Sequence, residues 1–310
     1  MRARLLRRVV LWFTALVALA AVAGFGYESV ARQDDGTRHP SPGRLVRVGE
    51  HRLHITCTGG GTPTVVLEAG LAESSASWAG IQRGLAGSAR VCAYDRAGYA
   101  WSEDGPEPRT AWQAAGELRA LLTTAGERGP YVLAGHSYGG NIVRIFADRW
   151  PDLTAGLVLI DVTDETADDA MSLSRPLLAT AFTTYGLLAR AGLLRLAGDA
   201  LVPGEATAFA RAHAPVVYGD RSMHAARAEA WSGLDSAEQV RTTVRPGVWG
   251  DRPVAVVVPS GQPDTALDRA RRLAALSSRG RLVIAGTAEH YVQAFQPALV
   301  IDTIRDVASG

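Results

Sequence analysis

The sequence predicts an α/β fold in which a mostly parallel sheet of eight strands is flanked by helices and carries an inserted helical cap. Three observations predict it. Short apolar runs alternate with helical patterns along the chain. Most of these runs are apolar at both odd and even positions, as strands buried on both faces must be. One long stretch, 162–251, is instead rich in alanine, leucine and arginine, with helical pieces and no strand pattern.

Eight runs have the composition of strands. The first two contain polar side chains among the apolar ones, whereas the runs from TVVLEAG onward have apolar residues at both odd and even positions. The expected strands are 44–49, 51–57, 64–70, 90–96, 131–137, 156–161, 253–258 and 281–286. The clearest connecting helix, TAWQAAGELRALLTTAG, begins with a Thr110 and Gln113 capping box and ends at Gly126.

The same patterns predict the domain organisation. We expect an α/β core formed by 44–161 and 252–310, with 162–251 inserted as the cap. A simple parallel crossover needs only about a dozen residues, so this insertion is too long to be one. Residues 28–43 contain two prolines and two glycines and are expected to be an irregular linker.

Residues 1–27 have the composition of a membrane anchor or a signal sequence. Four arginines, in MRARLLRR, precede an uncharged apolar run at 9–27. About 20 apolar residues cross a bilayer, whereas the apolar part of a secretory signal has roughly 7 to 15, so the length favours an uncleaved anchor. The alternative is cleavage near Ala21-Val22-Ala23, which would release a secreted protein. In both cases the arginines are expected to stay in the cytoplasm and the rest of the chain to be exported.

The overall composition excludes some classes of protein. With 310 residues, 47% of them hydrophobic, the chain can bury a large core. Its 32 basic and 31 acidic side chains give a formal net charge of +1. That balance provides no field to attract a polyanion, so we expect no nucleic-acid partner.

The segment YVLAGHSYGG contains the first candidate for chemistry. An apolar strand, 131–134, runs into a turn in which Gly135 and Gly139 bracket Ser137, and a helical pattern follows at 140–150. Residues beside a serine on so sharp a turn must lack bulk, and the turn lifts the hydroxyl above the sheet edge. Strand, G-x-S-x-G and helix together predict a nucleophile elbow with Ser137 as the nucleophile.

A serine nucleophile needs a base, and in this architecture the base is a histidine late in the chain. His290 follows the last predicted strand and precedes a helix that begins near Pro297. We therefore expect His290 to be the base. The other six histidines lie before the elbow, within it or in the cap: His39, His51, His54, His136, His213 and His224.

The carboxylate that orients His290 has two candidates. Asp264 follows the predicted strand 253–258, and Asp161 ends the strand before it. Both strand ends lie at the expected catalytic edge. Asp264 is the favoured acid and Asp161 the alternative, with Asp164, Glu165 and Asp268 as outside candidates.

From about Arg44 onward the chain resembles the α/β-hydrolase superfamily, especially its bacterial membrane-anchored or secreted members. The resemblance rests on LEAG, VCAYDRAGY, GHSYGG, LVLID and the late histidine. It implies an oxyanion hole formed by the backbone amides of Tyr138 and Leu71. It also implies that the DRAGYAWS segment, with Asp95, Arg96 and Gly98, is a structural turn without a chemical role.

The resemblance and the motifs predict a serine hydrolase that cleaves a carboxylic ester, or a related acyl bond, of a small molecule through an acyl-enzyme. No metal or organic cofactor is expected. Dehalogenases and epoxide hydrolases of this superfamily would need aspartate at position 137, which is serine. The alternatives are a peptidase like proline iminopeptidase and a non-catalytic ligand-binding homologue.

Cys57 and Cys92 are the only two cysteines. They lie in the second and fourth predicted strands, which the superfamily's strand order makes adjacent and antiparallel. Facing residues of such a pair have Cα atoms about 4.5–5.5 Å apart, within the span of a disulfide. Because export would provide an oxidising environment, the two are expected to be bridged.

Overall fold

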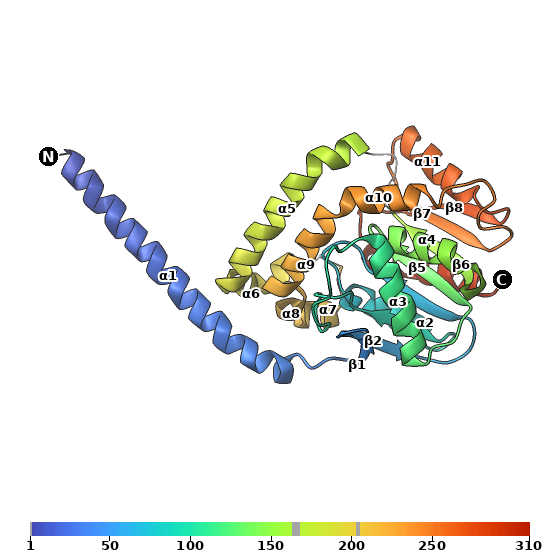
Figure 1. Ribbon diagram of the computed structural model, residues 1–310, viewed down its shortest axis with the longest axis horizontal. Coiled ribbons are helices and arrows are strands. Elements are labelled where there is room, and N and C mark those ends of the chain that lie inside the picture. The colour runs from blue at the N-terminus through green and yellow to red at the C-terminus, as the bar shows by residue number, and fades with distance from the viewer. Residues whose placement is uncertain (1, 163–167, 203–204) are drawn as a thin grey trace.

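The computed structural model describes residues 2–162, 168–202 and 205–310 (Figure 1). Its eight strands form one sheet in the order β1-β2-β4-β3-β5-β6-β7-β8. β2 is antiparallel to β1 and β4, and every other neighbouring pair is parallel. The strands are β1 Arg44–Val48, β2 His51–Thr58, β3 Thr64–Glu68, β4 Val91–Tyr94, β5 Tyr131–His136, β6 Thr154–Ile160, β7 Val254–Val258 and β8 Gly280–Ile284. The α/β fold with a mostly parallel eight-stranded sheet is therefore confirmed.

Helices cover both faces of the sheet because alternate residues of each strand point to opposite sides. On one face α3 (Ala111–Ala125), α4 (Gly139–Arg149) and α11 (Asp264–Ala274) pack on a core that includes Leu133 and Leu157. On the other face α2 (Ala79–Leu85), α12 (Val292–Phe295) and α13 (Pro297–Ala308) pack on Val132 and Val158. The 3₁₀ turn η1 (Ser75–Trp78) adds the buried Trp78 to the core, and a second, η2 (Pro151–Leu153), leads into β6.

The helix α3 has the ends that its sequence predicts. The Thr110 hydroxyl accepts a hydrogen bond from the Gln113 amide at the first turn. At the other end Gly126 takes a left-handed conformation with φ of 79°. A glycine adopts this conformation without the steric cost that a Cβ would impose, so the chain can leave the helix there.

The segment between β6 and β7 contains only helices among its described residues. These are α5 (Asp168–Arg190), α6 (Leu193–Ala197), η3 (Gly198–Leu201), α7 (Ala208–Ala212), α8 (Ala214–Val217), α9 (Asp220–Trp231) and α10 (Gly233–Arg241). They gather on one side of the sheet (Figure 1). Met223 of α9 packs with Phe182 and Ala189 of α5, so the segment has a small apolar core of its own. We refer to these helices as the cap.

The linker prediction is wrong for most of its length. The helix α1 (Arg2–Arg38) runs from the apolar N-terminal segment through residues 28–38, and β1 begins at Arg44. Within the helix, Arg32 pairs with Glu28 at 3.0 Å. Arg195 of α6 binds Glu28 at 2.8 Å and Asp35 at 2.7 Å. Both prolines lie beyond Arg38, so neither interrupts the helix. The ion pairs stabilise the polar helical turns of residues 28–38, whose composition had suggested irregular structure.

The N-terminal part of α1 extends away from the rest of the protein (Figure 1). A window of 18 residues within 4–38 has a mean hydropathy of 2.2, and none of it is buried. By length and composition this helix is long and apolar enough to cross a membrane.

A disulfide joins Cys57 of β2 to Cys92 of β4. The two residues face each other in the antiparallel register, with Cα atoms 4.1 Å apart. The bond therefore fastens the antiparallel edge of the sheet to its parallel part.

Candidate active site

Ser137 occupies a tight turn between β5 and α4. Its φ of 50° is rare for a residue with a side chain. A Cβ added to Gly135 would lie 2.8 Å from the carbonyl oxygen of Gly139, and one added to Gly139 would lie 2.6 Å from that of Ala69. Because no larger residue fits at either position, the two glycines allow the turn that presents Ser137 at the carboxyl end of the strand.

His290 lies in the loop between β8 and α12, and its Nδ1 is 2.6 Å from Oδ2 of Asp161. Asp161 directly follows β6 and has a φ of 42°. The pairing follows from the sheet register. Ile160 faces His136 across β5 and β6, and the Ser137 amide donates to the Ile160 carbonyl at 3.0 Å. Ser137 and Asp161 are therefore the first residues beyond two adjacent strand ends.

The structure pairs Asp161, and not the favoured Asp264, with His290. Asp264 is exposed and is the first residue of α11, where a carboxylate interacts favourably with the positive end of the helix dipole. Asp268 is engaged with Arg271 at 2.7 Å on the same helix. Asp164 and Glu165 lie outside the described residues. Asp264 follows its strand after a turn of several residues, which carries it into the helix and away from the strand end.

His136, directly before Ser137, holds the loop that carries His290. Its Nε2 lies 3.0 Å from the His290 carbonyl oxygen, and the two rings have centroids 4.6 Å apart. The same contact places the His290 loop over the elbow. Among the described residues no hydrogen bond joins the Ser137 hydroxyl to His290, and such contacts often form only when substrate is bound.

Glu73 fixes the other nitrogen of His136. Its Oε1 lies 2.6 Å from His136 Nδ1, and both side chains are buried. Burial alone would raise the pKa of Glu73, but the charge and hydrogen bond of His136 outweigh it and lower that pKa. Burial alone would lower the pKa of His136, and Glu73 reverses that effect and raises it. The two groups form a buried ion pair beneath the His290 loop.

One proposed oxyanion donor lies within the elbow and the other in the turn after β3. Tyr138 follows Ser137 and directly precedes α4, and Leu71 lies in the turn after β3. Within the described residues neither backbone amide donates a hydrogen bond to a protein acceptor. Amides at a helix N-terminus and in such a turn can stabilise negative charge on an oxygen.

This arrangement of strands, elbow and histidine loop agrees with a comparison to known families. The model of the family described as alpha/beta hydrolase fold matches residues 63–297, most of the chain. The chain belongs to the α/β-hydrolase family.

Three similar proteins show the range of this likeness. A probable transporter, efuK, from Hormonema carpetanum is 34% identical over 149 residues, covering 45% of this chain and 21% of that protein. An AB hydrolase superfamily protein from Gibberella zeae is 33% identical over 135 residues, 42% of each chain. This hydrolase-fold chain thus spans less than half the length of both relatives. The structure of a thermophilic esterase from Thermogutta terrifontis matches with a TM-score of 0.65 at 20% identity, over 86% of this chain and 98% of the esterase. At that identity the match shows the fold alone.

A pocket of this α/β-hydrolase lies between the core and the cap, beside the His290 loop. Tyr291, Gln293 and the Glu73 segment form its core side. Its apolar lining consists mainly of Ala76, Val202, Ala206, Ala210, Val217, Ala294 and Pro297, and the cap residues Glu205 and Thr207 also line it. Burial raises the pKa of Tyr218 and of Tyr291, so both hydroxyls stay neutral at ordinary pH. The pocket therefore suits an apolar ligand group.

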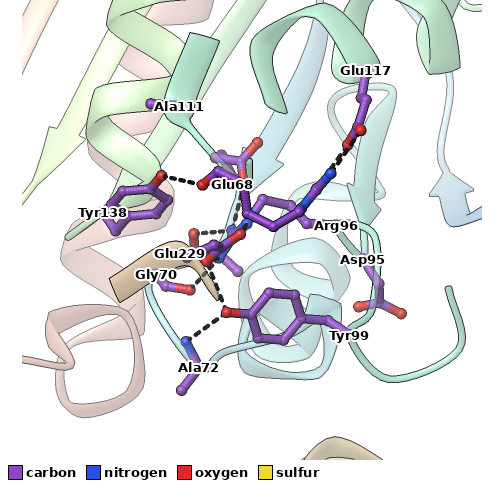
Figure 2. Close-up of polar contacts among 12 residues, drawn as sticks. Glu68, Gly70, Ala72, Asp95, Arg96, Tyr99, Ala111, Glu117, Tyr138 and Glu229 are labelled. Carbon is purple, nitrogen blue, oxygen red and sulfur yellow. Dashed lines mark hydrogen bonds and ion pairs between the residues drawn. The ribbon is translucent and has the colours of Figure 1, made fainter. Parts of the chain in front are cut away.

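Three side chains near the site were not among the candidates: Glu73, Arg96 as a binding group, and Glu229. Figure 2 shows Arg96 between Glu68, Glu229 and the Gly70 loop. The signal for Glu73 was its place directly after the LEAGLA segment, which contains the proposed donor Leu71. Glu229 had no such signal, because it lies 133 residues from Arg96 in the sequence.

Proposed function

We propose that this α/β-hydrolase is a serine hydrolase that cleaves carboxylic esters through an acyl-enzyme intermediate. One observation carries the proposal. The elbow presents Ser137 beside the end of β6, where Asp161 binds His290 Nδ1 at 2.6 Å. A serine on such a turn, with a histidine held by a carboxylate next to it, has the parts required for nucleophilic acyl transfer.

Asp161 accepts a hydrogen bond from Nδ1–H of His290 and so leaves Nε2 as the base. Nε2 takes the Ser137 proton as Oγ bonds to the ester carbonyl carbon, and the amides of Tyr138 and Leu71 stabilise the oxyanion. The tetrahedral intermediate then expels the alcohol, which receives the proton from His290. A water, deprotonated by the same nitrogen, attacks the acyl-enzyme. Release of the acid returns the proton to Ser137.

The pocket supports an ester with an apolar group. Its apolar lining consists mainly of small side chains, and its Glu73 carboxylate is paired with His136. A second carboxylate, that of Glu205, also lines the pocket and is the group that the free α-amino group of a peptide would bind. The peptidase remains the alternative, because it shares the G-x-S-x-G-G turn.

We also propose that α1 anchors the protein in the cell membrane and that the hydrolase domain lies outside the cytoplasm. The exposed apolar helix and the four arginines before it support this orientation. The alternative is a secreted protein released by cleavage within α1.

A fluorophosphonate probe and p-nitrophenyl esters of graded acyl length test the reaction. We expect the probe to label the wild type at Ser137 and ester hydrolysis to be lost in Ser137→Ala and in His290→Ala. Both variants should unfold at nearly the wild-type temperature, because both residues lie on loops above the core. Ser309→Ala, which changes an exposed serine at the C-terminus, serves as the control. Unlabelled wild type, or esterase activity retained by Ser137→Ala, contradicts the proposal.

Hydrolysis of a prolyl p-nitroanilide distinguishes the peptidase. A catalytic preference for this amide over every p-nitrophenyl ester would replace the esterase assignment by the peptidase one. A protein that binds esters without turnover or labelling would be the non-catalytic homologue.

A further inference from the structure

The side chain of Arg96 lies beneath the turn that follows β3. It donates from Nη1 to the Ala69 carbonyl at 2.6 Å and from Nη2 to the Gly70 carbonyl at 2.8 Å. Arg96 is buried and positioned directly after β4 and Asp95. Two consecutive carbonyls held by one planar guanidinium fix the orientation of both peptide groups that precede Leu71.

Tyr99 holds the other side of the same turn. Its hydroxyl accepts a hydrogen bond from the Ala72 amide at 3.4 Å and is itself buried (Figure 2). The Leu71 amide, the proposed oxyanion donor, thus lies between a carbonyl bound by Arg96 and an amide bound by Tyr99. We refer to residues 69–72 as the oxyanion loop.

Both of these side chains are held by one residue of the cap. Glu229, on α9, accepts from Arg96 Nε at 2.7 Å and from Nη2 at 2.9 Å. Its Oε2 also accepts from the Tyr99 hydroxyl at 2.7 Å. Glu229 is 1% exposed, so these contacts are shielded from water. Figure 2 shows Glu229 pointing at both side chains from the cap helix.

Arg96 also meets a second buried carboxylate, that of Glu68 on β3, which accepts from Nη1 at 2.8 Å. Burial raises the pKa of Glu68 to about 7 although the charge of Arg96 opposes this, so Glu68 is partly protonated near neutral pH. Position distinguishes the two carboxylates. Glu229 lies on the cap and binds both Arg96 and Tyr99, whereas Glu68 lies in the sheet.

We propose that Glu229 is a positioning residue for the oxyanion loop, acting through Arg96 and Tyr99, so that the Leu71 donor is aligned only when α9 of the cap is seated. This inference rests on the proposed serine-hydrolase function. It makes the cap part of the catalytic geometry as well as a wall of the pocket. Loss of Glu229 should weaken binding of the transition state more than binding of the substrate, because the donor acts on the oxyanion.

The test compares Glu229→Gln and Tyr99→Phe with two matched controls. Tyr94→Phe removes a hydroxyl that binds Glu68 in the same buried cluster without touching the oxyanion loop. Glu238→Gln neutralises an exposed cap carboxylate whose partner is the nearby Arg241. The measurements are kcat and KM for a p-nitrophenyl ester, and the inhibition constant of phenylboronic acid, which forms a tetrahedral adduct on a catalytic serine.

For Glu229→Gln and Tyr99→Phe we expect kcat to fall about 10- to 100-fold with KM within about 3-fold of the wild type, and boronate affinity to fall in parallel with kcat. The controls should stay within about 2-fold of the wild type in all three values. A purely structural contact between cap and core would shift KM or the unfolding temperature without this parallel loss.

Wild-type kcat and boronate affinity in Glu229→Gln or in folded Tyr99→Phe would overturn the inference. If Glu229→Gln fails to fold, Tyr99→Phe decides the question alone, because it keeps the ion pair. These results bear on the inference only if the fluorophosphonate labels the wild-type protein. An unlabelled wild type contradicts the serine-hydrolase function itself, a separate outcome from failure of the Glu229 variants.

Discussion

At the scale of single residues, local sequence identifies the nucleophile and leaves its partners undecided. The glycines around Ser137 are adjacent in the chain, so the elbow can be recognised from a short window. Asp161 and Asp264 both follow strands, and only the register of β5 against β6 shows which carboxylate comes beside the elbow. Glu229 and Arg96 meet through the packing of a cap helix on the core, which no local pattern encodes.

Asp161→Asn should reduce kcat for ester hydrolysis by on the order of 10³–10⁴-fold, because the amide disfavours the His290 tautomer that leaves Nε2 basic. Asp264→Asn should stay within about 2-fold, since Asp264 lies at the start of α11 and only the helix dipole senses its charge. Steady-state kinetics of the two variants, with thermal unfolding to show that both are folded, measure this difference. The reverse ranking would restore Asp264 as the acid.

Glu73→Gln should destabilise the protein in a pH-dependent way. The pKa of Glu73 is lower in the folded protein than in the unfolded chain. Its carboxylate therefore contributes stability at pH values above the unfolded pKa, and this stability is lost as pH falls through the folded pKa. The pKa of His136 is higher in the folded protein than in the unfolded chain. Its imidazolium therefore contributes stability at pH values below the unfolded pKa, and this stability is lost as pH rises through the folded pKa. The variant's deficit should therefore be largest between roughly pH 4.5 and 6.5. Urea unfolding across this range measures it, with exposed Glu50→Gln as a control that should show no such maximum.

At the scale of elements, the apolar runs predicted the strands, and the capping residues predicted where α3 begins and ends. Both signals lie within the element itself, so a short window of sequence contains them. The polar segment 28–38 was wrongly expected to be irregular. It is a helix whose Asp35 binds Arg195, which lies 160 residues away in the chain. Secondary structure that is stabilised by distant ion pairs cannot be predicted from the composition of a short window.

Arg195→Ala should therefore loosen the end of α1 without affecting catalysis. Removing the guanidinium leaves Glu28 and Asp35 without their cap partner, so the amides of residues 28–38 should exchange with deuterium faster. Ester hydrolysis should stay within about 2-fold of the wild type, because Arg195 and its two partners take no part in the proposed reaction. Arg272→Ala, on α11, is the control. Unchanged exchange in 28–38 would mean that this part of the helix does not depend on Arg195.

At the scale of the whole molecule, the N-terminal helix and the disulfide both bear on the proposed location outside the cytoplasm. The apolar part of α1 is exposed and preceded by arginines, which favours a membrane helix with an outward C-terminal side. The Cys57–Cys92 bond lies in the sheet of the hydrolase domain. Disulfides persist outside the cytosol and are rare within it, so an outward hydrolase domain should keep this bond and an inward one should lose it.

Thiol counting on protein from isolated membranes, combined with protease added to spheroplasts, tests this arrangement. We expect no alkylation by a maleimide after denaturation without reductant, two alkylated cysteines after reduction, and digestion of the hydrolase domain by external protease. Cys57→Ser with Cys92→Ser should lower the free energy of unfolding by about 2–4 kcal/mol, since the bond closes a long loop in the unfolded chain. Two free thiols in a protease-protected domain would place the domain in the cytoplasm. Digestion of a soluble protein that starts within α1 would instead show that the apolar helix is a cleaved signal, with the disulfide argument for export unchanged.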